Sequence, residues 1–463
     1  MNPHPRRLPA RTARQLALRP ANRQQGAVIL IVAFSLIAII GLAGLAIDTG
    51  RSYGVRAQLS AASDAAAVAA AHALSNGSSQ AERVANGKVA AARFFDLNYP
   101  QNTRGTTVGI PSTDIQRLST GEWRVTVNSQ AIMPNSLMRV LGIDQTTVST
   151  MSQTNRIPPD VMMVLDTSGS MSSDIGALKT AAKTSFVNRL IAGPGGDRLG
   201  LVSFANQTRL AVPIDKTASG GFDRQSIHSA IDGLIAQGWT GTSVAIRKSL
   251  DELQAIPVAN RSRLRVMLIF SDGAPNVFAT RVVQGTNRQD VHVAIDTSPW
   301  SVFRLHNPDP DGTDFTRDQS DTLKTWNFEG MTTGTTQLPG TDLGGIALSG
   351  ERAIPGYIAN KCNINRAARN ATENNASAVR DQNVRIFTIG LGAQLEKIES
   401  GFESCGYTAS DHGTNILRRL ANEKTVDTYD PSQPAGLFCF ARTSSDLDQC
   451  FAQIADEVVR LTL

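Results

Sequence analysis

The sequence predicts an α/β protein in which a doubly wound, mostly parallel sheet is covered by helices on both faces. Three observations predict this fold. Several continuous apolar runs have the length of strands that are buried on both faces, helical patterns alternate with these runs, and an uncharged run of 21 residues precedes them all. The uncharged run predicts an N-terminal transmembrane helix that continues into a long helix, and a small β-containing module follows it.

The apolar runs set the order of the expected strands. In chain order they are "DVMMVLD", "DRLGLVSFA", "RLRVMLIFSD" and "VRIFTIGLG". Helices are expected between and beside them, at about 174–192, 224–234, 243–256 and 363–380. About 110 residues rich in Asn, Thr, Asp and Gly separate the third run from the fourth. Because plain connections are much shorter, we expect this stretch to be a functional insertion or a subdomain.

The N-terminal region has the composition of a membrane anchor. The uncharged run Ala27–Ile47 would span about 30 Å as a helix, which is the thickness of a bilayer core. A cleaved signal peptide or a buried core helix is the alternative, but signal peptides have apolar regions of about 7–15 residues and a small-x-small cleavage site. The first 25 residues contain six arginines and no acid. The positive-inside rule therefore places this end in the cytoplasm and the bulk of the chain beyond the inner membrane.

Composition divides the chain into consecutive segments. Alanine-rich sequence favours helix after the anchor, β-branched alternation such as "EWRVTVNSQAIM" favours strands, and the prolines of "RIPPD" mark the start of the α/β domain. The expected segments are a basic cytoplasmic tail at 1–25, a transmembrane helix at 26–48, an alanine-rich helical segment at 49–100, a β-containing module at 101–156, and the α/β domain at 157–463 with a large insertion at about 274–362.

Charge and cysteine content bound the function classes. The net charge of +5 comes from the arginine-rich tail, and the rest of the chain is close to neutral, so a nucleic-acid-binding groove is not expected. The four cysteines are Cys362, Cys405, Cys439 and Cys450. In an exported segment they predict two disulfides, for which three pairings are possible. No pair has CxxC spacing, so a zinc site is not expected.

Polar residues cluster where the expected strands end. Asp166, Ser168 and Ser170 follow the first strand in "DTSGS", Asp272 follows a later one in "FSDG", and Thr242 opens a helix between them. Ligands of open α/β sheets bind beyond the carboxyl ends of the strands. Two carboxylates and three hydroxyls suit a hard divalent cation that keeps some positions for water or for a partner's carboxylate.

Other interpretations of "DTSGS" fit less well. A helix-capping turn explains Ser and Asp but not the additional presence of Thr242 and Asp272. A nucleophile elbow needs Gly-x-Ser-x-Gly, which is absent, and no histidine stands at an expected strand end to act as a base. An Asp-x-Asp phosphatase would need a carboxylate at Ser168, and no GxxxxGK[ST] loop is present. We therefore expect no enzymatic activity.

The same residues resemble a known family. Asp-x-Ser-x-Ser, a Gly-Thr about 70 residues later and "FSDG" are similar to the von Willebrand factor A domain and its metal-ion-dependent adhesion site. The resemblance implies that Asp166, Ser168 and Ser170 form the first loop of a metal site, Thr242 the second and Asp272 the third. The implied ion is Mg²⁺, with Mn²⁺ or Ca²⁺ as alternatives. Thr240 competes for the second loop, and Thr242 is favoured because it lies next to the helix start.

The chain ends resemble a second family. "AIDTGR" and "LSAASDAAAVAAA" near the N-terminus, and "SSDLDQCFAQIADEVVRLTL" at the other end, are similar to TadE/TadG-like proteins of the tight-adherence (Flp) pilus machinery. Pilin-like relatives are cut after a glycine and carry Glu five residues later. Counted from Gly26, that position holds Ile31, so the resemblance implies a permanent anchor and not a processed pilin.

These observations together predict a single-pass, membrane-anchored periplasmic factor of pilus assembly or adhesion. Its metal site would bind an acidic side chain of a partner protein. The alternatives are a structural envelope anchor whose fold uses no metal and, less favoured, a hydrolase. A calcium loop at Asn307–Asp318 is a further possibility, weakened by its prolines, and an acidic solvated loop is favoured there.

Overall fold

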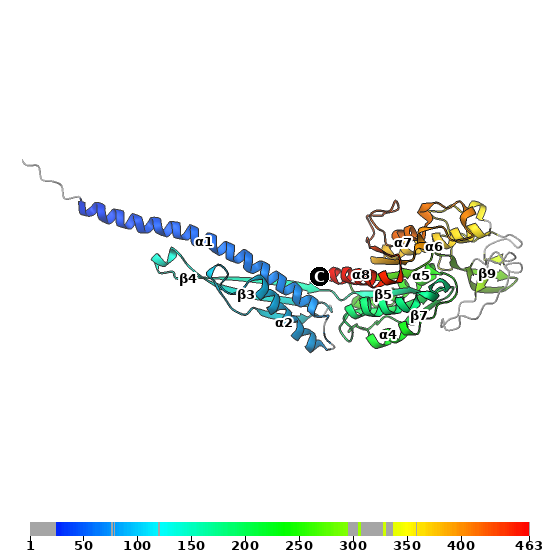
Figure 1. Cartoon of the computed structure of the whole chain (residues 1–463), viewed down its shortest axis with the longest axis horizontal. Coiled ribbons are helices and arrows are strands. Elements are labelled where there is room, and N and C mark those ends of the chain that lie inside the picture. Colours follow the sequence, from blue (N-terminus) through cyan, green and yellow to red (C-terminus); the bar gives the residue numbers. More distant parts are fainter. Residues whose placement is uncertain are drawn as a thin grey trace, which may run out of the picture. The chain divides into compact units, whose positions relative to one another are not determined.

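The computed structural model describes residues 25–75, 77, 79–118, 121–294, 304–306, 327–329, 337–357 and 359–462 (Figure 1). These residues form two units. The described part of the first unit is 25–59, 101–109 and 130–150, and the second comprises the described residues of 60–100, 110–129 and 151–462. The helix α1 and the strands β3 and β4 pass from one unit to the other along the chain. The candidate calcium loop at Asn307–Asp318 lies outside the described residues.

The uncharged run and the alanine-rich sequence that follows it form one helix, as expected. The helix α1, Gln25–Ala73, is 49 residues long, and within it an 18-residue window has a mean hydropathy of 2.9 and is 6% buried. Among the described residues it is the one helix long and apolar enough to cross a membrane, although a signal sequence would meet the same criterion. The helix α2, Gln80–Asn98, begins at Ser79, whose hydroxyl accepts a hydrogen bond from the Glu82 N–H (3.2 Å).

A small sheet occupies the region for which β-branched alternation predicted strands. Its order is β1-β3-β2, and β4 also pairs with β3. Along β3 every second residue is buried, as in a sheet with one covered face. A short 3₁₀ helix, Met138–Leu141, lies in the hairpin between β3 and β4. The strands are β1 (Thr107–Val108), β2 (Ser112–Arg117), β3 (Trp123–Pro134) and β4 (Gln145–Arg156).

The α/β domain is built on a six-stranded sheet of order β14-β13-β8-β5-β6-β7. All neighbours are parallel except the edge strand β7, which runs antiparallel to β6. The four apolar runs of the sequence form the inner strands, which confirms the expected fold class. Sequence patterns did not predict the edge strands, because β7 is only half buried and β14 has four residues. The strands are β5 (Asp160–Asp166), β6 (Arg198–Phe204), β7 (Thr208–Val212), β8 (Arg265–Ser271), β13 (Val384–Leu391) and β14 (Phe438–Ala441).

Helices cover both faces of this sheet, so alternate residues of the inner strands enter different cores. Val161, Met163 and Leu165 of β5 pack in one core, and Met162 and Val164 pack in the other. The first core is covered by α3 (Ile175–Ala181), α4 (Arg224–Asp232) and α8 (Leu447–Leu461), and the second by α5 (Thr242–Gln254), α6 (Lys361–Asp381) and α7 (Gly413–Leu420).

One helix differs from its expected extent. In place of a continuous helix over 174–192, α3 ends at Ala181 and continues as a π turn, Ala182–Phe186, and a 3₁₀ turn, Val187–Arg189. The hydroxyl of Thr180 donates to the Gly176 carbonyl, and that of Thr184 donates to the Thr180 carbonyl. Hydroxyls bonded back along a helix in this way bend it.

The stretch after β8 contains a second sheet, for which the sequence analysis identified no strands. Its order is β11-β10-β9-β12, and each neighbouring pair is antiparallel. A two-residue turn containing Gly285, whose φ is 61°, joins β9 to β10. Apolar residues of this sheet pack with α6 in a core of their own. The strands are β9 (Val277–Gln284), β10 (Asn287–Ala294), β11 (Arg304–His306) and β12 (Asn327–Phe328).

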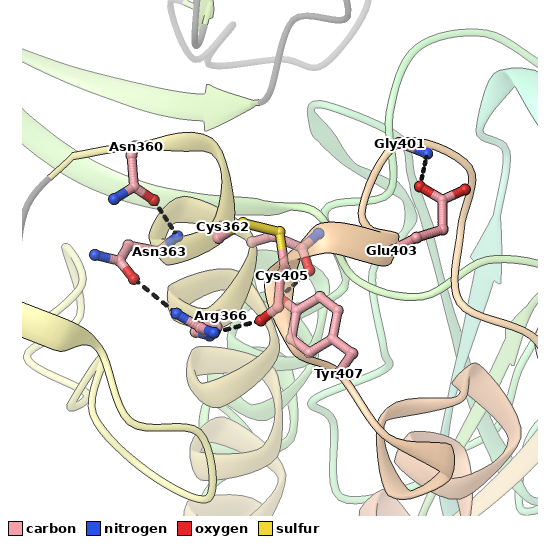
Figure 2. The surroundings of a disulfide bond; sticks show 9 residues. Asn360, Cys362, Asn363, Arg366, Gly401, Glu403, Cys405 and Tyr407 are labelled. Carbon is pink, nitrogen blue, oxygen red and sulfur yellow. Dashed lines mark hydrogen bonds between the residues drawn. A yellow bond between two sulfur atoms is a disulfide. The ribbon is translucent and has the colours of Figure 1, made fainter.

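The disulfide pairing that the sequence left open is Cys362 with Cys405 and Cys439 with Cys450. No cysteine remains free. Figure 2 shows the first bridge, which ties the first turn of α6 to the 3₁₀ turn Glu403–Cys405. Close to it, the Asn360 side chain caps α6 by accepting a hydrogen bond from the Asn363 N–H (2.9 Å). Arg366 of the same helix donates to the Cys405 carbonyl, which adds a second tie at this point (Figure 2).

Candidate metal centre

Two carboxylates emerge side by side at one edge of the central sheet. Asp166 is the last residue of β5, and Asp272 directly follows the last residue of β8. These strands are parallel neighbours, with Leu165 opposite Phe270. Their carboxyl ends therefore meet at the same edge, which is where open α/β sheets bind ligands.

Hydrogen bonds bring four of the five predicted site residues together. The Ser170 hydroxyl donates to Asp272 Oδ1 at 2.8 Å, and the Ser168 hydroxyl lies 3.5 Å from the same atom. The Ser168 and Ser170 Oγ atoms are 3.1 Å apart. Asp166 Oδ1 accepts a hydrogen bond from the Ser168 N–H at 2.8 Å. The Asp-x-Ser-x-Ser spacing thus folds the loop so that its polar side chains converge with those of the neighbouring strand end.

The fifth predicted residue, Thr242, is the first residue of α5 and has a free hydroxyl. Its side chain is buried, and its Oγ1 has no hydrogen-bond partner. The loop before it lies against the first loop, since the Gly169 N–H donates to the Gly238 carbonyl (2.9 Å). A buried hydroxyl without a partner is costly. A bound cation would give this oxygen a partner, whereas a plain capping turn leaves it unexplained.

The competing residue Thr240 has a structural role. Its backbone N–H donates to Asn276 Oδ1 (2.8 Å), and its carbonyl accepts a hydrogen bond from the Asn276 N–H (3.0 Å). These bonds join the loop before α5 to the segment that follows β8. They involve only its backbone, and Thr240 Oγ1 lies 3.2 Å from the place of a Cβ at Gly273, next to Asp272, so Thr240 stays the alternative to Thr242.

The charge on the two carboxylates has no compensating basic partner in their hydrogen bonds. Burial and, next to it, the nearby charge of Asp272 raise the pKa of Asp166 to about 7, although hydrogen bonds from Ser271 and Ser168 oppose the shift. Burial likewise raises the pKa of Asp272 to about 6, and the hydrogen bond from Ser170 opposes that shift. Adjacent buried carboxylates are unfavourable unless a positive charge lies between them.

The donor set fits a hard divalent cation. All its members are oxygens, two of them from carboxylates, and the described residues contain no cluster of three or more His, Cys, Asp or Glu side chains that could hold a metal ion. Such a set neutralises a divalent ion without surrounding it, so coordination positions remain for water or for an outside carboxylate. Ser170 is exposed, whereas the other four residues are buried, so the set is open to solvent on one side.

Two supporting residues were not identified from the sequence. The Ser271 hydroxyl donates to Asp166 Oδ2 and thereby orients the carboxylate. Gly238 has a φ of 83°, and a Cβ there would lie 2.0 Å from Asn206 Oδ1. Only a glycine therefore lets the loop run this close to the Asn206 side chain. The serine of "FSDG" and the glycine of "GWTGTS" were both visible, but only the fold shows what they contact.

A cavity of about 380 Å³ lies beside Asp272. Its lining includes Gly273 after β8, Gln394 and Lys397 after β13, and the acidic residue Glu399. The Gln394 side chain lies near the Asp272 carbonyl (3.4 Å). Asp272 therefore borders a hollow of the surface with room for a side chain from another molecule.

Comparison with known proteins explains this arrangement. The family model of the von Willebrand factor type A domain matches residues 161–274. The model described as putative Flp pilus-assembly TadE/G-like matches residues 26–73. The chain carries a TadE/G-like segment and a von Willebrand factor type A (VWA) domain. Both family resemblances are confirmed, the second through its N-terminal part, and the residues matched to the VWA domain include all five predicted ligands.

The solved structures that this chain matches include several pilus proteins. The pilus adhesin SpaC of Lactobacillus rhamnosus GG is 17% identical with a TM-score of 0.38, over 77% of this chain and 34% of that chain. The von Willebrand factor domain of the type V pili tip protein Mfa5 of Porphyromonas gingivalis is 17% identical with a TM-score of 0.37, over 66% and 97% of the two chains. The PilB minor pilin of Streptococcus sanguinis is 14% identical with a TM-score of 0.40, over 77% and 80%.

The present chain covers about a third of the length of the SpaC chains that it matches. No curated relative matches it in sequence.

Proposed function

We propose that the chain is a membrane-anchored factor of pilus assembly or adhesion whose VWA domain binds a partner protein through a divalent metal ion. Asp166, Ser168, Ser170, Thr242 and Asp272 would hold the ion, for which Mg²⁺ is favoured over Mn²⁺ or Ca²⁺. The observation that carries the proposal is the meeting of two buried carboxylates with hydroxyl donors at the ends of β5 and β8, and the unpaired, buried Oγ1 of Thr242 at the start of α5 supports it.

A carboxylate from the partner is the ligand that best completes such a site. The open side at Ser170 and the adjoining cavity admit an outside side chain. Lys397 lines that cavity together with Asp272, Glu399 and Glu403, so the bound ion and not the lining would attract an acidic group. The bound ion would supply a positive charge to which the partner's Asp or Glu binds, so that binding depends on the metal.

We infer binding and not catalysis at this site. The Ser168 and Ser170 hydroxyls bond to each other and to Asp272 within the described residues, and no imidazole accepts a proton from them. An activated serine requires such a base within hydrogen-bond reach.

The location that we propose is the bacterial inner membrane, with the N-terminus in the cytoplasm and the VWA domain in the periplasm. The apolar helix α1 and the arginines that precede it support this topology. We keep the segment boundaries inferred from composition, with the β-containing module at 101–156 and the VWA domain from 157.

Partner capture tests the metal-dependent binding. Full-length protein in detergent is immobilised and incubated with envelope extract of the source bacterium, with Mg²⁺, with EDTA, or with EDTA followed by excess Mg²⁺. We expect partners to be retained with Mg²⁺, released by EDTA and recovered when Mg²⁺ returns. Asp166→Ala should abolish retention, because it removes one of the two carboxylates. Bound proteins are identified by mass spectrometry.

Ser173→Ala is the matched control for this experiment. Ser173 lies in the same 3₁₀ turn as Ser170 but is exposed and donates to Asp174. Its replacement should leave capture unchanged. Retention that ignores both chelation and Asp166→Ala would contradict the proposal and favour the metal-independent envelope anchor.

Thiol labelling tests the compartment. All four cysteines are disulfide-bonded, and such bonds persist in the periplasm but not in the cytoplasm. Protein denatured directly from membranes in the presence of maleimide-polyethylene glycol should gain no label. The same sample should gain four labels per chain after reduction, one for each cysteine. Full labelling without reductant would place the VWA domain in the cytoplasm.

A further inference from the structure

The hairpin between β3 and β4 ends in an exposed apolar tip. Val140 is 58% exposed, Leu141 47% and Ile143 45%, although all three are large apolar side chains. We call residues 137–143 the hairpin tip. Single exposed apolar residues need no explanation. Three of them within four positions at the end of a hairpin form an apolar patch, and such patches mark sites of interaction with protein or membrane.

The hairpin tip packs against α1 inside the apolar part of that helix. Figure 1 shows the hairpin in cyan beside α1. A Cβ at Gly41 would lie 3.1 Å from Leu141 Cδ1, and a Cβ at Gly44 would lie 2.9 Å from Leu137 Cβ. Gly41 and Gly44 are buried, while the neighbouring side chains of the helix are exposed. The two glycines therefore allow the tip to approach the helix backbone closely.

Asp48 fixes the position of the hairpin tip along α1. It lies one turn beyond Gly44 on the same helix face and is buried. Its carboxylate accepts hydrogen bonds from the backbone N–H groups of Ser136 (2.9 Å), Leu137 (3.0 Å) and Met138 (2.9 Å). Three such bonds to one charged group define the position of the tip along the helix.

The position of Asp48 relates the hairpin tip to the membrane. Asp48 is the first charged residue after the apolar run of α1, so it marks the level at which the helix leaves the bilayer core. Gly41 lies seven residues earlier, which is about 10 Å deeper at the rise of an α-helix. Leu141, which packs at Gly41, therefore lies on the membrane side of Asp48, at about the depth to which interfacial apolar groups penetrate, 5–10 Å.

We propose that the hairpin tip inserts into the lipid leaflet from which α1 emerges, so that Val140, Leu141 and Ile143 contact acyl chains. The inference rests on the proposed membrane anchor, because it takes the depth of the tip from α1. Arg139 and Asp144 flank the apolar residues with side chains that are 61% and 76% exposed. They form an ion pair at 3.5 Å and provide a polar border at the level of the headgroups. The chain then contacts the bilayer at two sites, the helix and the tip.

Environment-sensitive labels on single introduced cysteines test this insertion. The native cysteines are all disulfide-bonded, so an added thiol is labelled alone. Full-length Val140→Cys, Ile143→Cys, Ile39→Cys and Ser149→Cys are each labelled with NBD and reconstituted in phosphatidylglycerol–phosphatidylethanolamine vesicles, with and without doxyl-labelled lipid. Ile39 lies in the apolar run of α1 and reports on the anchor. Ser149 is exposed on β4 of the same hairpin, about 20 Å from residue 143 at the rise of a strand.

The expected result is blue-shifted emission and strong doxyl quenching at positions 39, 140 and 143, with neither effect at 149. Quenching at 39 without quenching at 140 and 143 would leave the anchor standing and overturn the tip insertion. A blue shift at 140 without quenching by lipid would also overturn it, because protein and not lipid would then cover the tip. Absence of quenching at 39 would contradict the proposed anchor itself.

A second variant tests the docking on α1. Gly44→Leu keeps the helix apolar but places a side chain where Leu137 packs. We expect the label at 140 to lose its quenching in this variant while the label at 39 keeps it. Unchanged quenching at 140 would show that α1 does not determine the depth of the tip.

Discussion

Asp197→Ala is expected to lower the free energy of unfolding by about 3–5 kcal/mol, the usual cost of removing one partner of a buried ion pair. Arg156 Nη2 donates to Asp197 Oδ2 at 3.0 Å, and Nη1 lies 2.9 Å from Oδ1. The side chains are 2% and 0% exposed. The same carboxylate accepts a hydrogen bond from the Ile191 N–H (2.7 Å). The substitution therefore leaves a buried guanidinium without its counter-charge and a buried N–H without its acceptor.

The negative charge of Asp197 also stabilises two other arginines. Burial lowers the pKa of Arg83 and of Arg224, and the Asp197 carboxylate opposes that shift in both. Arg83 donates to the Ala192 carbonyl and Arg224 donates to the Leu190 carbonyl, so both guanidinium groups are held close to the segment before β6. Loss of Asp197 therefore increases the repulsion among several basic groups, which places the expected cost toward the upper part of the range.

Urea unfolding of the full-length protein in detergent, followed by tryptophan fluorescence, measures this cost. Asp456→Ala is the matched control, because Asp456 also pairs with an arginine, Arg189, but with side chains that are 66% and 42% exposed. An exposed pair of this kind contributes less than about 1 kcal/mol. Asp197→Asn retains an acceptor for Ile191 and should recover part of the loss. A loss no larger than that of Asp456→Ala would show that the buried pair does not stabilise the domain.

The inner strands were predictable because their signal is local. The runs beginning at Asp160, Arg198, Arg265 and Val384 are apolar at successive positions, since helices cover both faces. The edge strand β7 and the strand β10 carry polar residues at many positions, so their sequences do not differ clearly from loops, whereas β9 is mostly apolar and was missed although its pattern favours a strand. Register and pairing at an edge depend on neighbours that are distant in sequence.

The candidate site was predictable for a different reason. Asp166 and Asp272 each end a recognisable apolar run, and parallel topology brings such ends together. The support from Ser271, the pairing of Thr240 with Asn276 and the unpaired Oγ1 of Thr242 required the folded loops. The disulfide pairing and the ion pair of Arg156 with Asp197 also join residues whose separation in sequence carries no signal. The metal-binding role of the five residues stays a prediction.

Mg²⁺ should raise the free energy of unfolding of the wild-type protein by about 2.7 kcal/mol when the free ion is at 100 times its Kd, because an ion that binds only the folded state stabilises it by mass action. The reason lies in Asp166 and Asp272, which are 0% and 2% exposed and adjacent without a positive partner. The Kd comes from calorimetric titration of the EDTA-treated protein. Thermal unfolding with and without Mg²⁺ measures the stabilisation.

Asp272→Asn should have opposite effects on stability without and with Mg²⁺. The variant keeps the shape of the side chain but removes one of the two adjacent buried charges, so without Mg²⁺ it should be at least as stable as the wild type. With Mg²⁺ it should gain little, because the site has lost half of its carboxylate charge. Ser173→Ala should respond to Mg²⁺ as the wild type does. Equal stabilisation of wild type and Asp272→Asn would place the ion elsewhere, and a wild type that ignores Mg²⁺ would make the VWA domain a metal-independent binding module. Opposite effects of one substitution in the two buffers are expected only if Asp272 serves ion binding at the expense of the stability of the metal-free fold.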